Sequence, residues 1–321
     1  MSELRALESI SDYEGFDFPR LWRGREKVTE VERSFLTAAF APADRRRLLE
    51  VGTGFGRLLG SLENLGDEIV AMDFDFGSLA RLRSPGVQGD RTLRIAANIY
   101  HLPFVDGAFT GATMIRVYHH LVDPAAALAE LCRVLQPSGT LLVSYNPKPT
   151  VGTLVNDIQR ALHPSPEGRF RSMTFDRARH IELPPDPFPV HVGPREEFEQ
   201  IVRSVGFEPR TEMVSGFEEY HLMKRVPTRL FVQLGTSFGR APGFPMRFAI
   251  LASPRGAMKP LPARDGILAC PVCREPIERG LEEESVICPG CSFRGRRRDG
   301  VLDLRYVPDG VIRWKQGDTP H

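Results

Sequence analysis

Four of the five cysteines lie near the C-terminus in two closely spaced pairs. Two residues separate the thiols within each pair, and 14 residues separate the pairs. Two such CxxC pairs can place four thiolates around one ion, the tetrahedral set that a structural zinc needs. We therefore expect Zn²⁺, rather than disulfides or iron, to stabilise a small C-terminal domain. The expected ligands are Cys270, Cys273, Cys288 and Cys291.

A second group of residues with chemical potential begins at three glycines in alternate positions, Gly52, Gly54 and Gly56. They follow an apolar run directly, so side chains there would collide with a ligand lying over the end of a strand. A carboxylate, Asp73, ends the next apolar run about 20 residues later, the position from which a side chain binds a ribose. A phosphate-binding dinucleotide loop or a plain strand-to-helix turn would also fit the glycines alone.

The elements that must position these residues alternate between short apolar runs and helical patterns. We expect strands at 46–51, 68–72, 93–97, 111–115, 140–144, 208–214 and 246–252, and helices at 57–65, 77–82, 125–135 and 194–205. Strands alternating with helices at this spacing indicate βαβ units and a parallel sheet, hence an α/β fold. Proline-rich, irregular insertions are expected near 150–193 and 216–245.

The composition narrows the classes of function. The chain has 321 residues, 41% of them hydrophobic and 26% charged, and a formal net charge of +1. This balance gives no global signal for binding nucleic acid or acidic lipid. No run approaches the roughly 18 apolar residues of a membrane span, and the first residues lack the apolar core of a signal peptide. We therefore expect a cytoplasmic protein with no membrane partner.

Five motifs follow one another through the α/β region. They are LEVGTGFG at 49–56, VAMDFD at 70–75, LPFVDGAF at 102–109, HHLVDP at 119–124 and ELCRVLQPSG at 130–139. In this order they resemble the class I S-adenosylmethionine-dependent methyltransferases of the ubiquinone and menaquinone type. The resemblance implies a Rossmann-like, seven-stranded, mostly parallel sheet with flanking helices, S-adenosyl-L-methionine as cofactor, and in-line methyl transfer.

The resemblance also assigns expected roles to matching positions. Glu50 would face the methionine ammonium, and Asp73 would accept both ribose hydroxyls, since a carboxylate offers two oxygens to a vicinal diol. Asn98, which stands where the family often has aspartate, and Ile99 would flank the adenine. The implied cofactor set is Glu50, Gly52, Thr53, Gly54, Gly56, Asp73, Phe74, Asn98 and Ile99, with Arg25 from an N-terminal lid.

Three further residues are candidates for the transfer step itself. Arg116, just after the fourth strand, would face the methyl-transfer region and could bind an anion. His119 and His120 are candidate general bases, which the reaction needs only when the acceptor must lose a proton. Packing or capping before the next helix is the alternative for the histidines, and a salt-bridged surface position is the alternative for Arg116.

The cysteine segment has a resemblance of its own. Residues 268–304 resemble the small zinc-ribbon activator proteins of RNA and protein methyltransferases, which bind and stabilise a separate catalytic subunit. Here the equivalent would be fused to its partner and would dock on the methyltransferase sheet. The basic run at 294–298 could touch phosphates, although nearby glutamates at 282–284 offset its charge.

These features predict three parts: an N-terminal lid at 1–44, a methyltransferase domain at 45–258, and a zinc ribbon with its tail at 266–321. The leading function is methylation of a small-molecule metabolite or natural-product intermediate. A tRNA or rRNA methyltransferase whose ribbon binds RNA is the second possibility. A non-catalytic scaffold that binds the cofactor is the third.

Overall fold

The computed structural model describes residues 9–15, 17–147, 193–216, 225–237, 244, 246–278, 280–281 and 283–315. The first predicted insertion lies outside the described residues except for Gly193, and the second is described only in part. Within its described part, α10 (Thr228–Ser237) forms a helix where an irregular stretch was expected. No helix of the described residues is long and apolar enough to cross a membrane.

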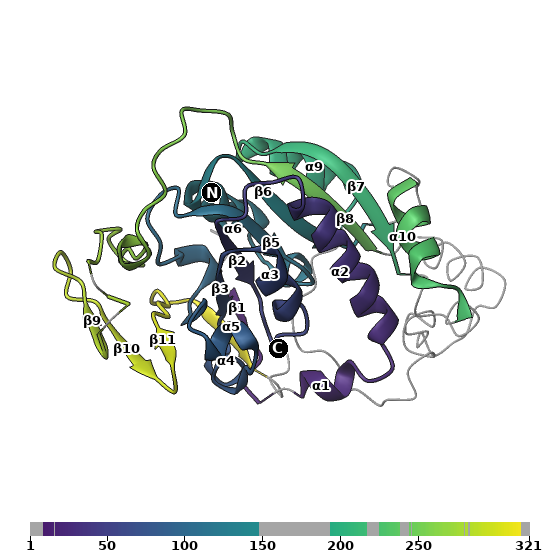
Figure 1. The fold of residues 1–321 in the computed structure, drawn as a ribbon. Helices are drawn as coiled ribbons and strands as arrows, with labels where there is room; N and C mark the ends of the chain where they lie inside the picture. Colours follow the sequence, from purple (N-terminus) through teal and green to yellow (C-terminus); the bar gives the residue numbers. More distant parts are fainter. Residues whose placement is uncertain are drawn as a thin grey trace, which may run out of the picture.

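A twisted sheet of ten strands dominates the molecule, in the order β7-β8-β6-β5-β2-β3-β4-β11-β10-β9 (Figure 1). The first seven have the bounds β2 Arg47–Val51, β3 Glu68–Asp73, β4 Thr92–Ala96, β5 Phe109–Met114, β6 Leu135–Tyr145, β7 Glu208–Ser215 and β8 Met246–Ala252. Strands β4, β3, β2, β5 and β6 run parallel, whereas β8 is antiparallel to both β6 and β7. The predicted α/β fold class with a mostly parallel sheet is confirmed.

Helices cover both faces of the sheet, and alternate residues of the buried strands pack into two separate cores. In β2, for example, Leu48 belongs to one core and Leu49 to the other. The helices are α1 Phe18–Leu21, α2 Glu26–Phe40, α3 Leu59–Leu65, α4 Phe76–Arg81, α5 Pro85–Gln88, α6 Pro124–Val134 and α9 Arg195–Ser204. Helix α6 begins where its sequence predicts, because the Asp123 side chain caps Ala126 N–H and Pro124 occupies the first turn.

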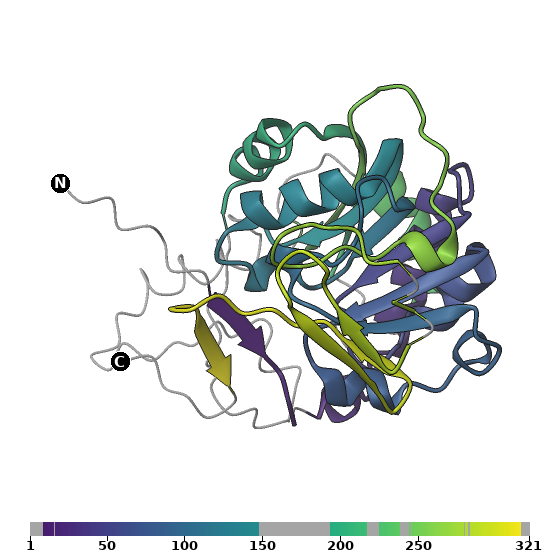
Figure 2. The same ribbon diagram turned by 90° about the vertical axis from the view of Figure 1, so that its left-hand side faces the viewer.

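The C-terminal strands extend the sheet instead of forming a separate unit. These are β9 (Ser285–Ile287), β10 (Arg294–Arg298) and β11 (Val301–Asp303). Strand β11 runs parallel to β4, with Leu302 opposite Ile95 (Figure 2). Leu302 and Leu304 are fully buried in the same core as β2 and α6. The seven strands expected for the methyltransferase are therefore joined by three more, because the ribbon completes its own core against the edge of β4.

A second, two-stranded sheet joins the two ends of the described chain. Strand β1 (Ser9–Asp12) pairs in parallel with β12 (Ile312–Lys315), apart from the main sheet (Figure 2). Neither strand was expected from the sequence. The pairing brings residues 312–315, which follow the ribbon strands, next to residues 9–12 of the N-terminal segment.

Candidate active site and metal centre

A pocket opens at the carboxyl ends of β2, β3, β4 and β5, where an open α/β sheet binds its ligands. It encloses about 1150 Å³, its mouth included. Ten of the predicted site residues line it: Glu50, Gly52, Thr53, Gly54, Asp73, Phe74, Asn98, Ile99, Arg116 and His120. Gly56, Arg25 and His119 lie outside the lining. The remaining wall includes Tyr13, Phe18 and Trp22, which belong to the predicted N-terminal lid, and Arg57, which the sequence had not placed at the site.

The glycine loop leaves β2 in a conformation that favours glycine. Gly52, Gly54 and Gly56 have φ angles of +73°, +53° and +81°. A Cβ on Gly52 would come within 2.2 Å of Val117 Cγ2, so a neighbouring side chain also requires glycine there. At Gly54 a Cβ would meet no atom within 4 Å. The pocket therefore leaves open space over this glycine, as the close approach of a ligand to the backbone requires.

Two carboxyl groups lie beside this loop; Glu50 is buried and Asp73 is half-buried. Glu50 Oε2 has no hydrogen-bond partner among the described residues, and burial raises the pKa of Glu50 to about 8. Burial also raises the pKa of Asp73 to about 6, against the opposing effect of hydrogen bonds from the backbone N–H groups of Asp75 and Gly54. Gly54 N–H donates to Asp73 Oδ2 at 2.7 Å. A cationic or hydroxyl-bearing ligand would compensate these two acids.

The segment that follows β11 forms hydrogen bonds with two pocket residues, Asn98 and Phe74. Asn98 Nδ2 donates to the carbonyl of Tyr306 at 3.0 Å, and Asn98 Oδ1 accepts from Tyr100 N–H at 3.1 Å. Arg305 Nη1 donates to the carbonyl of Phe74 at 3.3 Å. The amide that the sequence assigned to adenine thus already holds the C-terminal segment in place.

A cluster of charged residues surrounds Trp22 at another part of the pocket. The fully buried Glu32 accepts from Arg116 Nε at 2.7 Å and forms a second ion pair with Arg57. The guanidinium carbons of Arg57, Arg116 and Arg25 lie 4.0, 4.9 and 5.2 Å from the Trp22 ring centre. Burial opposes ionisation of Glu32, yet the charges of Arg116 and Arg57 hold its pKa below the usual value.

Arg116 adopts a backbone conformation that is rare outside glycine. Its φ is +61°, and its N–H donates to Ser144 Oγ at 2.6 Å. Such a conformation costs about 1–3 kcal/mol and persists only where the surroundings enforce it. The hydrogen bond from β6 and the ion pair with Glu32 supply that constraint.

The two candidate histidines share the short 3₁₀ turn η2 (Tyr118–His120). Burial lowers the pKa of His120 to about 4 and that of His119 well below its usual value. Tyr13 Oη lies 2.9 Å from His120 Nε2. Both imidazoles are therefore neutral near pH 7 and weakly basic, and His120 is the one that lines the pocket.

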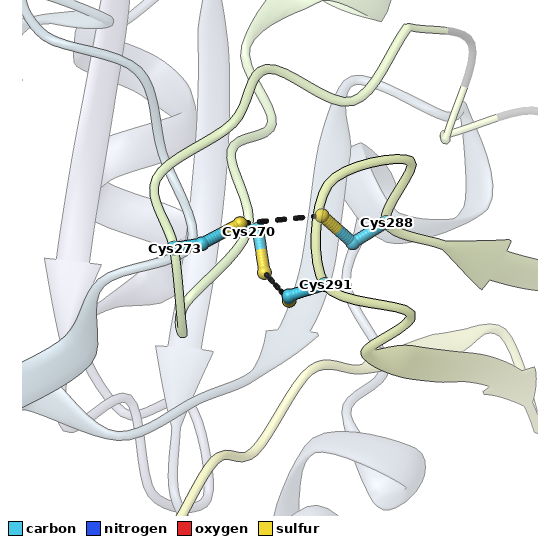
Figure 3. A group of neighbouring side chains, drawn as sticks. All are labelled: Cys270, Cys273, Cys288 and Cys291. Carbon is cyan, nitrogen blue, oxygen red and sulfur yellow. Dashed lines mark hydrogen bonds between the residues drawn. The ribbon is translucent and has the colours of Figure 1, made fainter.

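The four C-terminal cysteines converge from two loops (Figure 3). Cys270 Sγ lies 3.5 Å from Cys291 Sγ, and Cys273 Sγ lies 3.5 Å from Cys288 Sγ. All four sulfur atoms lie within 4.8 Å of one another. The N–H groups of Val272 and Gly290 point at Cys270 and Cys288 sulfurs. Four thiols gathered this closely form the donor set of a structural zinc site.

The fold, the glycine loop and the acidic strand ends define a class I S-adenosylmethionine-dependent methyltransferase. A family model described as a methyltransferase domain matches residues 49–143. The demethylmenaquinone methyltransferase of Thermus thermophilus is 32% identical over 177 residues, which are 53% of this chain and 78% of that protein. The chain therefore belongs to the S-adenosylmethionine-dependent methyltransferases.

Other relatives match over shorter lengths. The demethylmenaquinone methyltransferase of Clavibacter sepedonicus is 33% identical over 139 residues, and the chain spans 57% of its length. Among solved structures, a complex of the Haloferax volcanii Trm112 methyltransferase activator with a methyltransferase gives a TM-score of 0.48 at 16% identity, covering 75% of this chain and 97% of that one.

Proposed function

We propose that the chain transfers the methyl group of S-adenosyl-L-methionine to a small-molecule acceptor. The observation that carries this proposal is a pocket in which the buried carboxyl group of Glu50 and the half-buried one of Asp73 flank a glycine loop with open space over Gly54. Since the sulfonium cofactor brings its own leaving group, the protein's task is to bind and align. The relatives named for demethylmenaquinone favour a small acceptor.

Each part of the cofactor would meet a different strand end. Glu50 would accept hydrogen bonds from the methionine ammonium, whose charge would ionise this carboxyl group. Asp73 would accept from the ribose hydroxyls. Phe74, Asn98 and Ile99 would contact the adenine, with the loop residues Gly52, Thr53 and Gly54 beneath the sugar and sulfonium; these positions all line the pocket.

The zinc ribbon would be a structural part of the enzyme. We propose that Cys270, Cys273, Cys288 and Cys291 hold Zn²⁺, which would crosslink the two loops and leave no open position for catalysis. Two arginines of the basic run also make contacts within the fold, which weakens the argument for an RNA acceptor. Arg297 donates to the carbonyl of Leu281, and Arg298 stacks on Phe76.

The test of cofactor binding is calorimetry with S-adenosylhomocysteine. Asp73→Ala should weaken binding about 10–100-fold, since two hydrogen bonds to a charged group are lost. The exposed Asp67, six residues earlier in the chain, provides the matched control Asp67→Ala. Equal affinity in wild type and Asp73→Ala would overturn the cofactor site.

A labelled-methyl assay in cell extract, with and without ribonuclease, separates small-molecule acceptors from RNA acceptors. No methyl transfer at all would favour a non-catalytic scaffold that only binds the cofactor.

A further inference from the structure

Three residues, Phe74, Asn98 and Ile99, line the side of the pocket proposed for the adenine and are here called the adenine wall. The amide of Asn98 is engaged on both of its polar atoms. Oδ1 accepts from the N–H of Tyr100 at 3.1 Å, and Nδ2 donates to the carbonyl of Tyr306 at 3.0 Å. This orientation pairs an acceptor with a donor at each end of the amide. An adenine amino group would therefore have to share Oδ1 with the turn that Asn98 caps.

The segment after β11 continues the pairing of β11 with β4. The N–H of Leu304 donates to the carbonyl of Ala96 at 2.9 Å. Beyond Ala96 the chain leaves the strand and enters the 3₁₀ turn η1 (Ile99–His101), so its backbone no longer runs beside this segment. The Asn98 side chain, which carries the same chemical group as a peptide bond, supplies the next donor, to Tyr306.

The same segment also contacts other residues on this side of the pocket. Arg305 Nη1 donates to the carbonyl of Phe74 at 3.3 Å, and its guanidinium carbon lies 5.5 Å from the Phe74 ring centre. The ring of Tyr306 meets that of His101 edge-on, with 5.1 Å between the ring centres. One short segment of the C-terminal region thus supports the residues that follow both β3 and β4.

The position of Asn98 requires an amide and not a carboxylate. Asparagine and aspartate cap the start of a helical turn about equally well, so the bond to Tyr100 does not explain the amide. A carboxylate would place an oxygen without a hydrogen against the carbonyl oxygen of Tyr306. Asn98 is only 1% exposed, so water could not compensate the lost bond or the added charge. The carbonyl of Tyr306 therefore accounts for the amide at this position.

Resting on the cofactor site proposed above, we propose that Asn98 is a positioning residue whose amide holds the segment after β11 against the adenine wall, and that it flanks the adenine without recognising its amino group. The C-terminal region then sets the shape of the pocket from behind, through a main-chain carbonyl. A wall that is correctly placed for only a fraction of the time binds ligand with an affinity reduced by that fraction. Loss of the Asn98 donor should therefore weaken all ligands that contact this wall to the same extent.

The first experiment uses a substitution for which holding and recognition predict opposite results. Asn98→Asp keeps an acceptor for the Tyr100 N–H and offers a stronger acceptor to an adenine amino group, but it loses the donor to Tyr306. We expect the variant to bind S-adenosylhomocysteine at least about tenfold more weakly than wild type in calorimetry, or roughly 1.4 kcal/mol. Equal or higher affinity would show that Asn98 recognises the base and would overturn the proposal. Asn64→Asp, at an exposed position on α3, adds the same charge and should bind like wild type.

A neutral variant, Asn98→Ser, removes the donor to Tyr306 but keeps an oxygen that can cap the turn. It is titrated with S-adenosylhomocysteine and with S-inosylhomocysteine, whose base has a carbonyl in place of the amino group. Both affinities should fall by about threefold or more. The ratio of the two dissociation constants should stay within about twofold of its wild-type value, because neither base is recognised by this side chain. A larger change in the ratio, or no loss of affinity, would overturn the proposal.

Hydrogen exchange of the ligand-free protein tests the contact directly. Asn98→Ser should accelerate exchange in residues 304–307 and leave β5 at the wild-type rate. Unchanged exchange in residues 304–307, or equally faster exchange in β5, would overturn the positioning role, since the second result indicates a general loss of stability. Wild type that bound no S-adenosylhomocysteine would instead defeat the proposed function, and the exchange rates would still test how Asn98 holds the segment.

Discussion

Glu50 occupies the last position but one of β2, facing a pocket with no partner for its second oxygen among the described residues. A carboxyl group buried in this way is costly to ionise, and it remains protonated until a cation arrives. If Glu50 binds the cofactor's ammonium as proposed above, binding would release a proton from this carboxyl group.

The first prediction is a pH dependence of stability without cofactor. Folded Glu50 keeps its proton up to about pH 8, whereas in the unfolded chain it loses the proton near 4.5. The folded state therefore binds more protons between these values, and the free energy of unfolding falls by up to about 1.4 kcal/mol per pH unit as pH rises. Glu50→Gln should remove this fall between pH 6.5 and 8, as followed by thermal melting. The prediction would be wrong if the melting temperatures of Glu50→Gln and wild type changed with pH in the same way.

The second prediction concerns Glu32, the buried partner of two arginines. Glu32→Gln leaves both guanidinium groups without their carboxylate and should destabilise the protein by about 3–5 kcal/mol in urea unfolding. Glu26→Gln, an exposed position on the same helix, should cost under about 1 kcal/mol. A loss at Glu32 no larger than that at Glu26 would show that the pair contributes little.

The sequence predicted the pocket residues that belong to local motifs. It did not predict the contacts between residues that lie far apart in the chain. Glu50, Asp73 and the glycines sit at the ends of strands whose periodicity is visible in the sequence. Trp22 belongs to the N-terminal segment predicted as a lid, but its contacts with the arginines were not predicted, and Glu32 gave no signal because a glutamate within a helix looks like an ordinary surface residue. These contacts form only when α2 packs on the sheet, because Glu32 then pairs with Arg57 and Arg116.

At the scale of elements, the strands of the sheet lie within a few residues of their predicted ranges, with β6 as the largest departure. It begins at Leu135 rather than at 140, because Leu135 pairs with Phe109 before an irregularity in register. The docking of β11 on β4 was not predictable from periodicity, since a three-residue strand has no pattern and edge pairing depends on tertiary contact.

The third prediction follows from that docking. Leu302 and Leu304 lie in the methyltransferase core, so loosening the ribbon should expose apolar surface of both parts. Removal of metal by a strong chelator, or Cys273→Ser, should lower the melting temperature of the whole chain in one transition. Cys132→Ser removes the lone cysteine outside the cluster and should leave the response to chelator unchanged. Two separate transitions after chelation would mean that ribbon and sheet fold independently.

At the scale of the whole molecule, the two ends of the described chain meet beside the pocket. Strand β1 carries Ile10, which lines the pocket, and β12 is its hydrogen-bonding partner. Tyr13, just after β1, reaches His120. Strand β12 therefore helps to hold β1 beside the pocket.

The fourth prediction tests this link by truncation. Ending the chain after Val311 removes β12 and should weaken S-adenosylhomocysteine binding about 3–10-fold, since the ordered state of the segment is then less populated. Ending it after Lys315 keeps β12 and should preserve the affinity. Equal affinities of the two truncated proteins for S-adenosylhomocysteine, measured by calorimetry, would show that β12 has no role at the pocket.

The pairing of β11 with β4 has a consequence for how the protein behaves at low concentration. A strand supplied by a second polypeptide leaves its neighbour as the solution is diluted past the dissociation constant of the pair. A strand carried on the same chain stays at a high effective concentration whatever the dilution. Ribbon and catalytic sheet are therefore always present one to one, and catalytic turnover per molecule should remain constant from micromolar to nanomolar protein.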